Sequence, residues 1–210
     1  MRGLLIKDFL ILKKNARVFL GLTVLYLAMA IFLHTDFGVL MAFMMGMLSI
    51  TSFAYDEQAK WDAFALTMPV TKRDMVTAKY ILVLLLGIAG AVIGLILSFT
   101  ASLGLGVVDI LDTLKNVGLG ICATYVFSSI ALPLVYKLGS EKSRLVLMVC
   151  YAAPILLGTI VINMLEDATL TMPELLSAGQ TAAILLPFIT VAAMAISYRI
   201  SLSVFQKKDL

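Results

Sequence analysis

Charge, histidine and cysteine are all scarce in this chain. Of its 210 residues, 14% are charged, one is histidine and two are cysteine, whereas a soluble domain carries roughly 25% charged residues. Hydrophobic residues make up 61% of the chain, and the mean hydropathy is +1.04. A soluble domain of this composition would expose too much apolar surface to stay dispersed in water. The scarcity of charge therefore predicts a membrane protein.

The few histidine and cysteine residues give no basis for a metal site or a catalytic centre. His34 has no second histidine or cysteine at ligand spacing. Cys122 and Cys150 fall at depths that differ by about 12 Å at 1.5 Å per residue, which is beyond disulfide reach. No G-x-x-x-x-G-K-[ST] phosphate loop is present. We expect no catalytic residue, no metal and no cofactor in this chain, so that any nucleotide is hydrolysed by another polypeptide.

Six apolar segments are long enough to cross a bilayer, which takes about 20 mostly apolar residues. They cover residues 17–35, 37–55, 80–103, 116–136, 145–165 and 180–200. No cleavable signal peptide is apparent, because the first apolar run is interrupted by charges and leads into a full span. Gly90 and Gly94 form a GxxxG pair in the third segment, which is typical of helix–helix contacts. The sequence predicts an all-α integral membrane protein with six spans in a single domain, residues 1–210.

Basic residues lie almost entirely on one side of the predicted spans. All but one of the sixteen Lys and Arg residues fall in the N-terminal stretch, the loops after spans two and four, and the C-terminal tail; Lys115 is the exception. Because Lys and Arg are enriched in cytoplasmic loops, both termini are predicted to be cytoplasmic. The basic residues follow the membrane boundaries and form no single stripe, so the charge gives no support for nucleic-acid binding.

The N-terminal stretch, residues 1–16, alternates apolar clusters with charges. This pattern favours a helix that lies in the cytoplasmic interface of the membrane. The alternative is that the stretch only extends the first span.

The cytoplasmic loop at residues 56–79 interrupts the apolar sequence with charges and the only tryptophan. Its helix-forming composition predicts a short helix from Asp56 to Met68, which Pro69 ends because the residue before proline is disfavoured in the α region. Thr71 and Asp74 then form a capping box that starts the next helix.

The predicted helix in this loop has the residue types of a docking element, which needs an aromatic or apolar anchor with a polar rim. Trp61, Phe64, Ala65 and Met68 fall on one stripe of a helix. Asp56 and Lys60 lie at helix-pair spacing on the rim, where an exposed ion pair contributes only about 0–1 kcal/mol. The candidate docking residues are Tyr55, Asp56, Glu57, Lys60, Trp61, Asp62, Phe64 and Met68. The alternative is a plain interfacial helix that buries its aromatics among lipid headgroups.

The same loop, YDEQAKWDAFALTMPVTKRDMVTAKY, resembles the signature loop of a bacterial family of ABC-2-type transporter permeases, which includes the membrane subunits of exporters for phenol-soluble modulin peptides. The opening MRGLLIKDFLILKKN and the second cytoplasmic loop, LPLVYKLGSEKSR at 132–144, are similar to the same family. The resemblance implies six spans, an N-terminal connecting helix and a coupling helix over Asp56–Met68 that docks on an ATPase. The second-loop residues that it singles out are Lys137, Gly139, Ser140, Glu141 and Lys142.

The resemblance also implies a function and its partners. The chain would be the membrane subunit of an ATP-driven exporter in the bacterial plasma membrane, surrounded by lipid and paired with a second permease chain, identical or paralogous. Two cytosolic ABC ATPase subunits would hold the ATP and Mg, and the cargo would be apolar or amphipathic, by resemblance a peptide. An ion-coupled carrier or channel is disfavoured because the middles of the predicted spans contain no charged residue. A non-transport sensor or assembly component stays open.

The distribution of basic residues makes the topology testable by cysteine labelling of intact cells. Single cysteines placed at Asp112 and Glu174 should react with a membrane-impermeant reagent, because both residues fall on the side that is poor in Lys and Arg. Cysteines at Asp62 and Lys142 should react only after the membrane is opened. Labelling of either cytoplasmic position from outside would overturn the predicted orientation.

Overall fold

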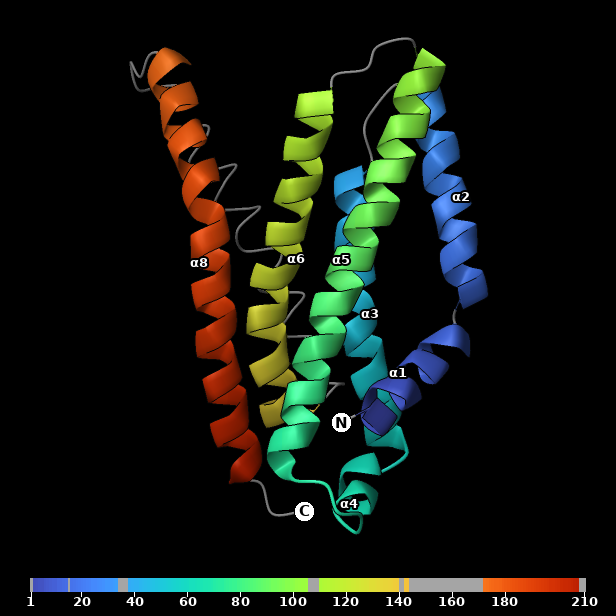
Figure 1. The fold of residues 1–210 in the computed structure, drawn as a ribbon, viewed down its shortest axis with the longest axis vertical. Helices are drawn as coiled ribbons and strands as arrows, with labels where there is room; N and C mark the ends of the chain where they lie inside the picture. Colours follow the sequence, from blue (N-terminus) through green and yellow to red (C-terminus); the bar gives the residue numbers. More distant parts are fainter. Residues whose placement is uncertain are drawn as a thin grey trace.

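In a computed structural model of the chain, residues 2–14, 16–33, 38–105, 110–139, 142–143 and 172–207 are described, and every regular element among them is an α-helix. The helices are α1 (Arg2–Lys14), α2 (Ala16–Leu33), α3 (Gly38–Gln58), α4 (Trp61–Ala65), α5 (Lys72–Leu105), α6 (Ile110–Leu138) and α8 (Met172–Gln206). Figure 1 shows α2, α3, α5, α6 and α8 running along the long axis, while α1 and α4 lie at the lower end, here termed the base. The all-α prediction is confirmed for the described residues.

Five of the six predicted spans coincide with described helices, namely α2, α3, α5, α6 and α8. The remaining predicted span, the fifth along the chain at residues 145–165, lies outside the described residues. Three described stretches are long and apolar enough to cross a membrane: Lys72–Thr100, Thr113–Leu138 and Leu185–Gln206. These stretches support a membrane protein, whereas the count of six spans stays a prediction.

The N-terminal helix is separate from the first predicted span. α1 ends at Lys14 and α2 begins at Ala16, and Figure 1 shows α1 crossing the base at an angle to α2. Leu4 and Leu12 of α1 are buried in hydrophobic clusters with residues of α3 and α5. The alternative, that this stretch only extends the first span, is therefore wrong.

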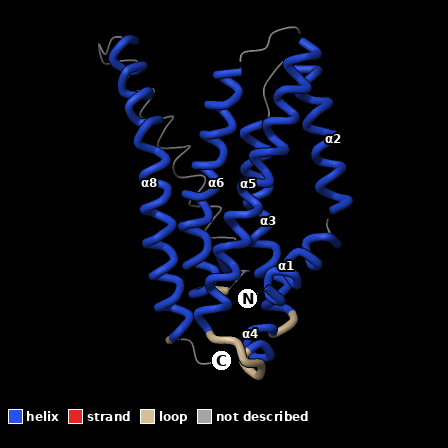
Figure 2. The backbone as a smooth tube through the Cα atoms, viewed as in Figure 1, coloured by secondary structure: helices blue, strands red, loops and turns tan. Residues whose placement is uncertain are grey.

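The prediction of one helix from Asp56 to Met68 is also wrong. α3 continues to Gln58, and the short α4 covers only Trp61–Ala65. Between them Lys60 has a left-handed backbone, with φ of 49°, a conformation that residues other than glycine seldom adopt. This left-handed residue ends the α3 helix and turns the chain sharply; Figure 2 shows the loop segments on both sides of α4 at the base.

The capping box that starts α5 is confirmed by its hydrogen bonds. The backbone N–H of Asp74 donates to Thr71 Oγ1 over 3.1 Å, and the backbone N–H of Thr71 donates to Asp74 Oδ2 over 3.2 Å. The Thr71 hydroxyl donates to the same carboxylate oxygen over 2.7 Å. These reciprocal bonds satisfy backbone donors at the first turn of a 34-residue helix.

The base of the bundle is held together by aromatic contacts. Tyr136 of α6 lies 5.1 Å, centroid to centroid, from Phe53 of α3 and 5.1 Å from Phe205 of α8. The Tyr80 hydroxyl of α5 shares hydrogen bonds with Ser197 and Ser201 of α8, at 2.6 and 2.8 Å. Helix–helix packing and hydrogen bonds of this kind replace the hydrophobic driving force that is absent between helices in lipid.

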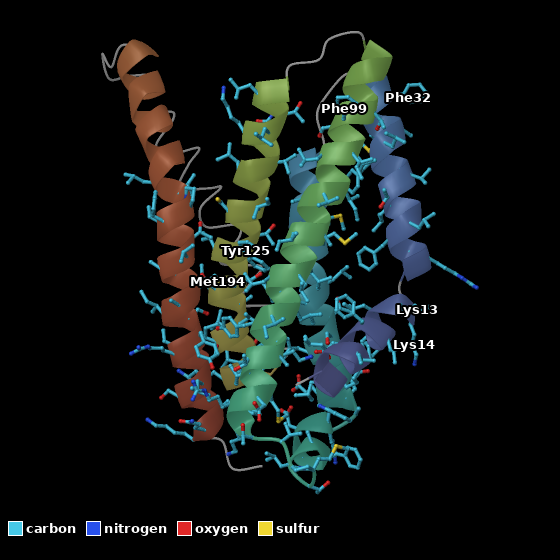
Figure 3. All side chains as sticks on the ribbon, in the orientation of Figure 1. Lys13, Lys14, Phe32, Phe99, Tyr125 and Met194 are labelled. Atoms are coloured by element: carbon cyan, nitrogen blue, oxygen red, sulfur yellow. The ribbon has the colours of Figure 1, made fainter. Side chains whose placement is uncertain are left out.

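A line of glycines on α5 allows close packing against a neighbouring helix. Gly90 and Gly94 are both buried, which confirms the prediction that this pair faces protein. A Cβ atom at Gly87 would come within 2.8 Å of Cζ of Tyr125, which Figure 3 labels between α5 and α6. The Tyr125 hydroxyl donates to the Leu84 carbonyl over 3.0 Å, so the ring has a fixed place against α5.

Replacing Gly87 by leucine should therefore weaken the packing of α5 on α6. Overpacking destabilises a protein by about 1–3 kcal/mol. In a chain of this size each kcal/mol lowers the melting midpoint by about 2–4 °C. Gly118→Leu is the matched control, because nothing lies within 4 Å of a Cβ atom built there. The melting midpoints of both variants are measured by heating the protein in detergent and detecting the folded fraction by size-exclusion chromatography. Equal midpoints for the two variants would contradict the close contact at Gly87.

Candidate functional site

Four charged side chains converge where α1, α3 and α5 meet at the base. Lys7 and Asp8 come from α1, Asp56 from the last turn of α3 and Lys79 from the first turns of α5. Asp8, Asp56 and Lys79 are only 1%, 6% and 7% exposed. These four residues are termed the ionic cluster.

Each lysine of the ionic cluster contacts both aspartates. Lys79 Nζ lies 2.9 Å from Asp8 Oδ1 and 2.6 Å from Asp56 Oδ2. Lys7 Nζ lies 3.1 Å from Asp8 Oδ1 and 2.6 Å from Asp56 Oδ1. The Ser52 hydroxyl accepts a hydrogen bond from Lys79 over 2.7 Å and donates to Asp8 over 2.9 Å. The cluster is thus electrically neutral, and every charge in it faces an opposite one.

Burial determines how the ionic cluster contributes to the stability of the protein. An intact buried ion pair adds little net stability, because its attraction is offset by the loss of hydration. Removing one partner is different, since it leaves an uncompensated charge and destabilises by about 3–5 kcal/mol. The cluster therefore specifies one arrangement of α1, α3 and α5 and disfavours arrangements that separate them.

The prediction that Asp56 is an exposed rim charge paired with Lys60 is wrong. Because α3 continues past residue 56, its helical geometry turns Asp56 inward, where Lys7 and Lys79 bind it. Lys60 is exposed and lies at the left-handed turn. Sequence spacing identified a partner within reach, but the closer partners come from two other helices.

Aromatic rings connect the ionic cluster to α4. Lys7 Nζ lies 4.4 Å from the centroid of the Trp61 ring, and Lys79 Nζ lies 4.8 Å from that of Phe53. Cation–π contacts of this kind are strongest where water is excluded. Trp61 in turn packs against Phe64, with 5.5 Å between ring centroids. α4 is thus attached to the cluster through Trp61.

The two faces of α4 have different surroundings. Ala65 is completely buried, and Trp61 and Leu66 pack against the hydrophobic core of the base. Phe64 and Met68 are 53% and 39% exposed. The prediction of one continuous apolar stripe is therefore wrong: α4 ends at Ala65, so Met68 lies after the helix and is not part of its buried face. What remains exposed is an aromatic and a thioether side chain at the tip of the base.

Gly139, in the second of the predicted cytoplasmic loops, lies against the end of α3. Its φ is +84°, which glycine adopts without strain, and its N–H donates to the Val135 carbonyl over 2.9 Å as α6 ends. A Cβ atom there would lie 2.5 Å from Glu57 Oε1. The glycine is needed both for the backbone turn and for the approach of the Glu57 carboxylate.

A cavity of about 50 Å³ joins these parts of the site. Its lining includes the ionic cluster together with Glu57, Trp61, Asp62 and Gly139. The other predicted site residues have separate positions: Tyr55 is exposed on α3, Lys137 and Lys142 are exposed, and Ser140 and Glu141 lie outside the described residues. The structure therefore brings five of the thirteen predicted residues together around this cavity, and the six other predicted residues that it describes are exposed.

Lys7, Asp8 and Lys79 were not predicted as site residues. Asp8 is the only acidic residue among the first 35, and Lys79 directly precedes the apolar run of α5. An isolated acid in a basic helix and an isolated base at the edge of a span are weak signals, but together they indicate an ion pair between elements. The pairing could not be predicted from the sequence, because Asp8 and Lys79 are 71 residues apart.

Asp56→Asn should destabilise the protein far more than its neighbour Glu57→Gln. The first change removes the carboxylate that both Lys7 and Lys79 contact and leaves excess positive charge in a buried place, at about 3–5 kcal/mol. Glu57 is exposed, where ion pairs contribute about 0–1 kcal/mol. Melting midpoints in detergent measure the difference. Small and equal shifts in the two variants would show that the cluster does not hold the base together.

A match to one protein family covers almost the whole chain. Residues 3–206, from α1 to the last turn of α8, match the family model described as ABC-2 family transporter protein. Comparisons with curated proteins and with solved structures give no match. The matched range contains the ionic cluster, α4 and Gly139. The chain therefore belongs to the ABC-2 family of transporter proteins.

Proposed function

We propose that this membrane permease subunit belongs to an ATP-driven exporter and that α4 is the element through which a separate cytosolic ATPase acts on it. Membership of the ABC-2 transporter family supports the permease role. The observation that carries the proposal is the position of Phe64, which is 53% exposed at the base and packs on the Trp61 ring that covers Lys7.

An ATPase on a separate chain is the energy source that this sequence favours. The chain contains no phosphate loop, and the ABC-2 family is a family of transporter membrane components. A docking surface on the ATPase would need a groove for one or two apolar side chains, with polar groups at its margin. Phe64 and Met68, next to Asp62 and Lys60, supply the complementary types.

The contacts behind α4 supply a route for movement into the spans. A push on Phe64 reaches Trp61, and Trp61 lies against Lys7 of the ionic cluster. Through the cluster, Lys7 is connected to α1, α3 and α5 at once. Packed groups with fixed partners transmit displacement instead of absorbing it. α4 would therefore move three helices together.

The expected cargo is apolar or amphipathic, and by resemblance a peptide. The described helices carry no charged residue between Lys79 and Leu105, or between Lys115 and Lys137. A strongly charged substrate would find no opposite charge there. We place a second permease chain, identical or paralogous, on the other side of the pathway, and two ATPase subunits at the cytoplasmic ends.

Phe64→Ala tests the docking role of α4 without disturbing the ionic cluster. Truncation of a central aromatic in a desolvated interface costs about 2–4 kcal/mol, or roughly 30- to 1,000-fold in affinity. The measurement is co-purification of the partner ATPase, identified by mass spectrometry through its phosphate loop, together with ATP hydrolysis in reconstituted vesicles. Trp61→Ala is less suitable, because it also removes the contact with Lys7.

Phe188→Ala is the control for Phe64→Ala. Phe188 is 73% exposed on α8 and is part of neither the lining of the cavity at the base nor α4, so each variant removes one exposed phenyl ring. We expect the control to retain the ATPase while the Phe64 variant releases it. Normal ATPase association and normal transport in the Phe64 variant would show that α4 is an interfacial helix and no docking element.

A further inference from the structure

An elongated apolar groove lies beside α2, away from the ionic cluster. It has a volume of about 650 Å³ and is lined by residues of α1, α2, α3 and α5. Apolar side chains make up most of the lining, among them Phe9, Leu12, Phe19, Leu20, Leu48 and Ile93. Thr23 also lines the groove, but its hydroxyl donates to the Phe19 carbonyl of its own helix over 2.8 Å. The groove therefore presents a hydrocarbon surface to whatever occupies it.

The length of the groove matches one leaflet of a bilayer. Along α5 its lining runs from Leu86 to Leu97, which is about 16 Å at 1.5 Å per residue. The hydrocarbon core of a bilayer is about 30 Å thick, so the groove covers close to half of it. Its volume falls within the range of about 300–1,000 Å³ for ligand sites in proteins.

Three cationic side chains lie at one end of the groove. Lys13 lines it, Lys14 follows at the end of α1, and Arg17 lies in the first turn of α2. All three are exposed, and Figure 3 shows Lys13 and Lys14 where α1 meets α2. Within the described part of the chain no carboxylate is paired with any of them, since Asp8 of the same helix is held by Lys7 and Lys79.

We propose that the groove binds a phospholipid with a negatively charged headgroup, with one acyl chain between α2 and α5 and the headgroup on Lys13, Lys14 and Arg17. The positive end and the apolar length match the two parts of such a lipid in the cytoplasmic leaflet, where the basic residues place this end of the chain. A basic residue near an anionic lipid surface favours binding by about fivefold. A second copy in a two-fold contact would bring its own three cations toward these.

Native mass spectrometry of the purified full chain in detergent tests the lipid preference. The probes are phosphatidylglycerol and phosphatidylcholine with the same acyl chains. We expect tight binding of one phosphatidylglycerol per groove and a preference for it that falls by at least about tenfold when Lys13, Lys14 and Arg17 are all changed to glutamine. The matched control changes Lys137, Lys142 and Lys207 to glutamine, three exposed cations away from the groove, and should keep the preference.

Photo-crosslinking of the unaltered protein locates the acyl chain and needs no variant to fold. A phosphatidylglycerol with a diazirine in its acyl chain should label peptides that contain Leu20 and Ile93, which line the groove. Ile93→Trp should fill the groove and abolish this labelling, and Thr23→Trp repeats the test from α2 if the first variant does not fold.

Four outcomes would overturn the proposal. The first is equal binding of the two lipids by the unaltered chain, and the second is loss of preference in the control with three distant changes. The third is labelling spread evenly over exposed faces such as Phe188 and Ile189 of α8. A chain dimer that the groove-filling variants dissociate would instead assign the groove to a second copy.

Discussion

The buried ionic cluster is the constraint on which the rest of the base depends. Four charges from three helices neutralise one another where water has little access. In such surroundings a charge without a partner is far more costly than an unfilled apolar contact. The positions of α1 beneath the bundle and of α4 at its tip follow from this one requirement, because Lys7 serves both the aspartates and the Trp61 ring.

The molecule is unevenly packed, and the two kinds of region suit different tasks. At the base, aromatic contacts and the ionic cluster join α1, α3, α5, α6 and α8 into one firmly packed unit. Along part of α2, an open apolar groove lies between this helix and α1, α3 and α5. Regions with few buried contacts open and rearrange more easily than the core. The base is suited to receive and distribute a displacement, whereas the region of α2 is suited to exchange contacts with lipid.

Sequence reasoning succeeded where the cause is local and failed where it is tertiary. Apolar length predicted the positions of α2, α3, α5, α6 and α8, and the Thr71 capping box predicted the start of α5. The extent of α4 could not be predicted, because no propensity indicates that Lys60 adopts a left-handed backbone. Asp56 was assigned to the surface, since its burial depends on Lys7 and Lys79 arriving from distant parts of the chain. The ionic cluster as a whole could not be predicted for the same reason, because its members come from distant parts of the chain.

The spacing of the ionic cluster along the chain also sets an order of events during synthesis. Chains emerge and fold from the N-terminus onward, so Lys7 and Asp8 are made long before Lys79, which follows Asp8 by 71 residues. Until then the emerging chain holds two aspartates against one lysine of the final set, and α1 has no neutral place to dock. The electrically neutral docking place of the N-terminal helix is therefore complete only once Lys79 of α5 has been made.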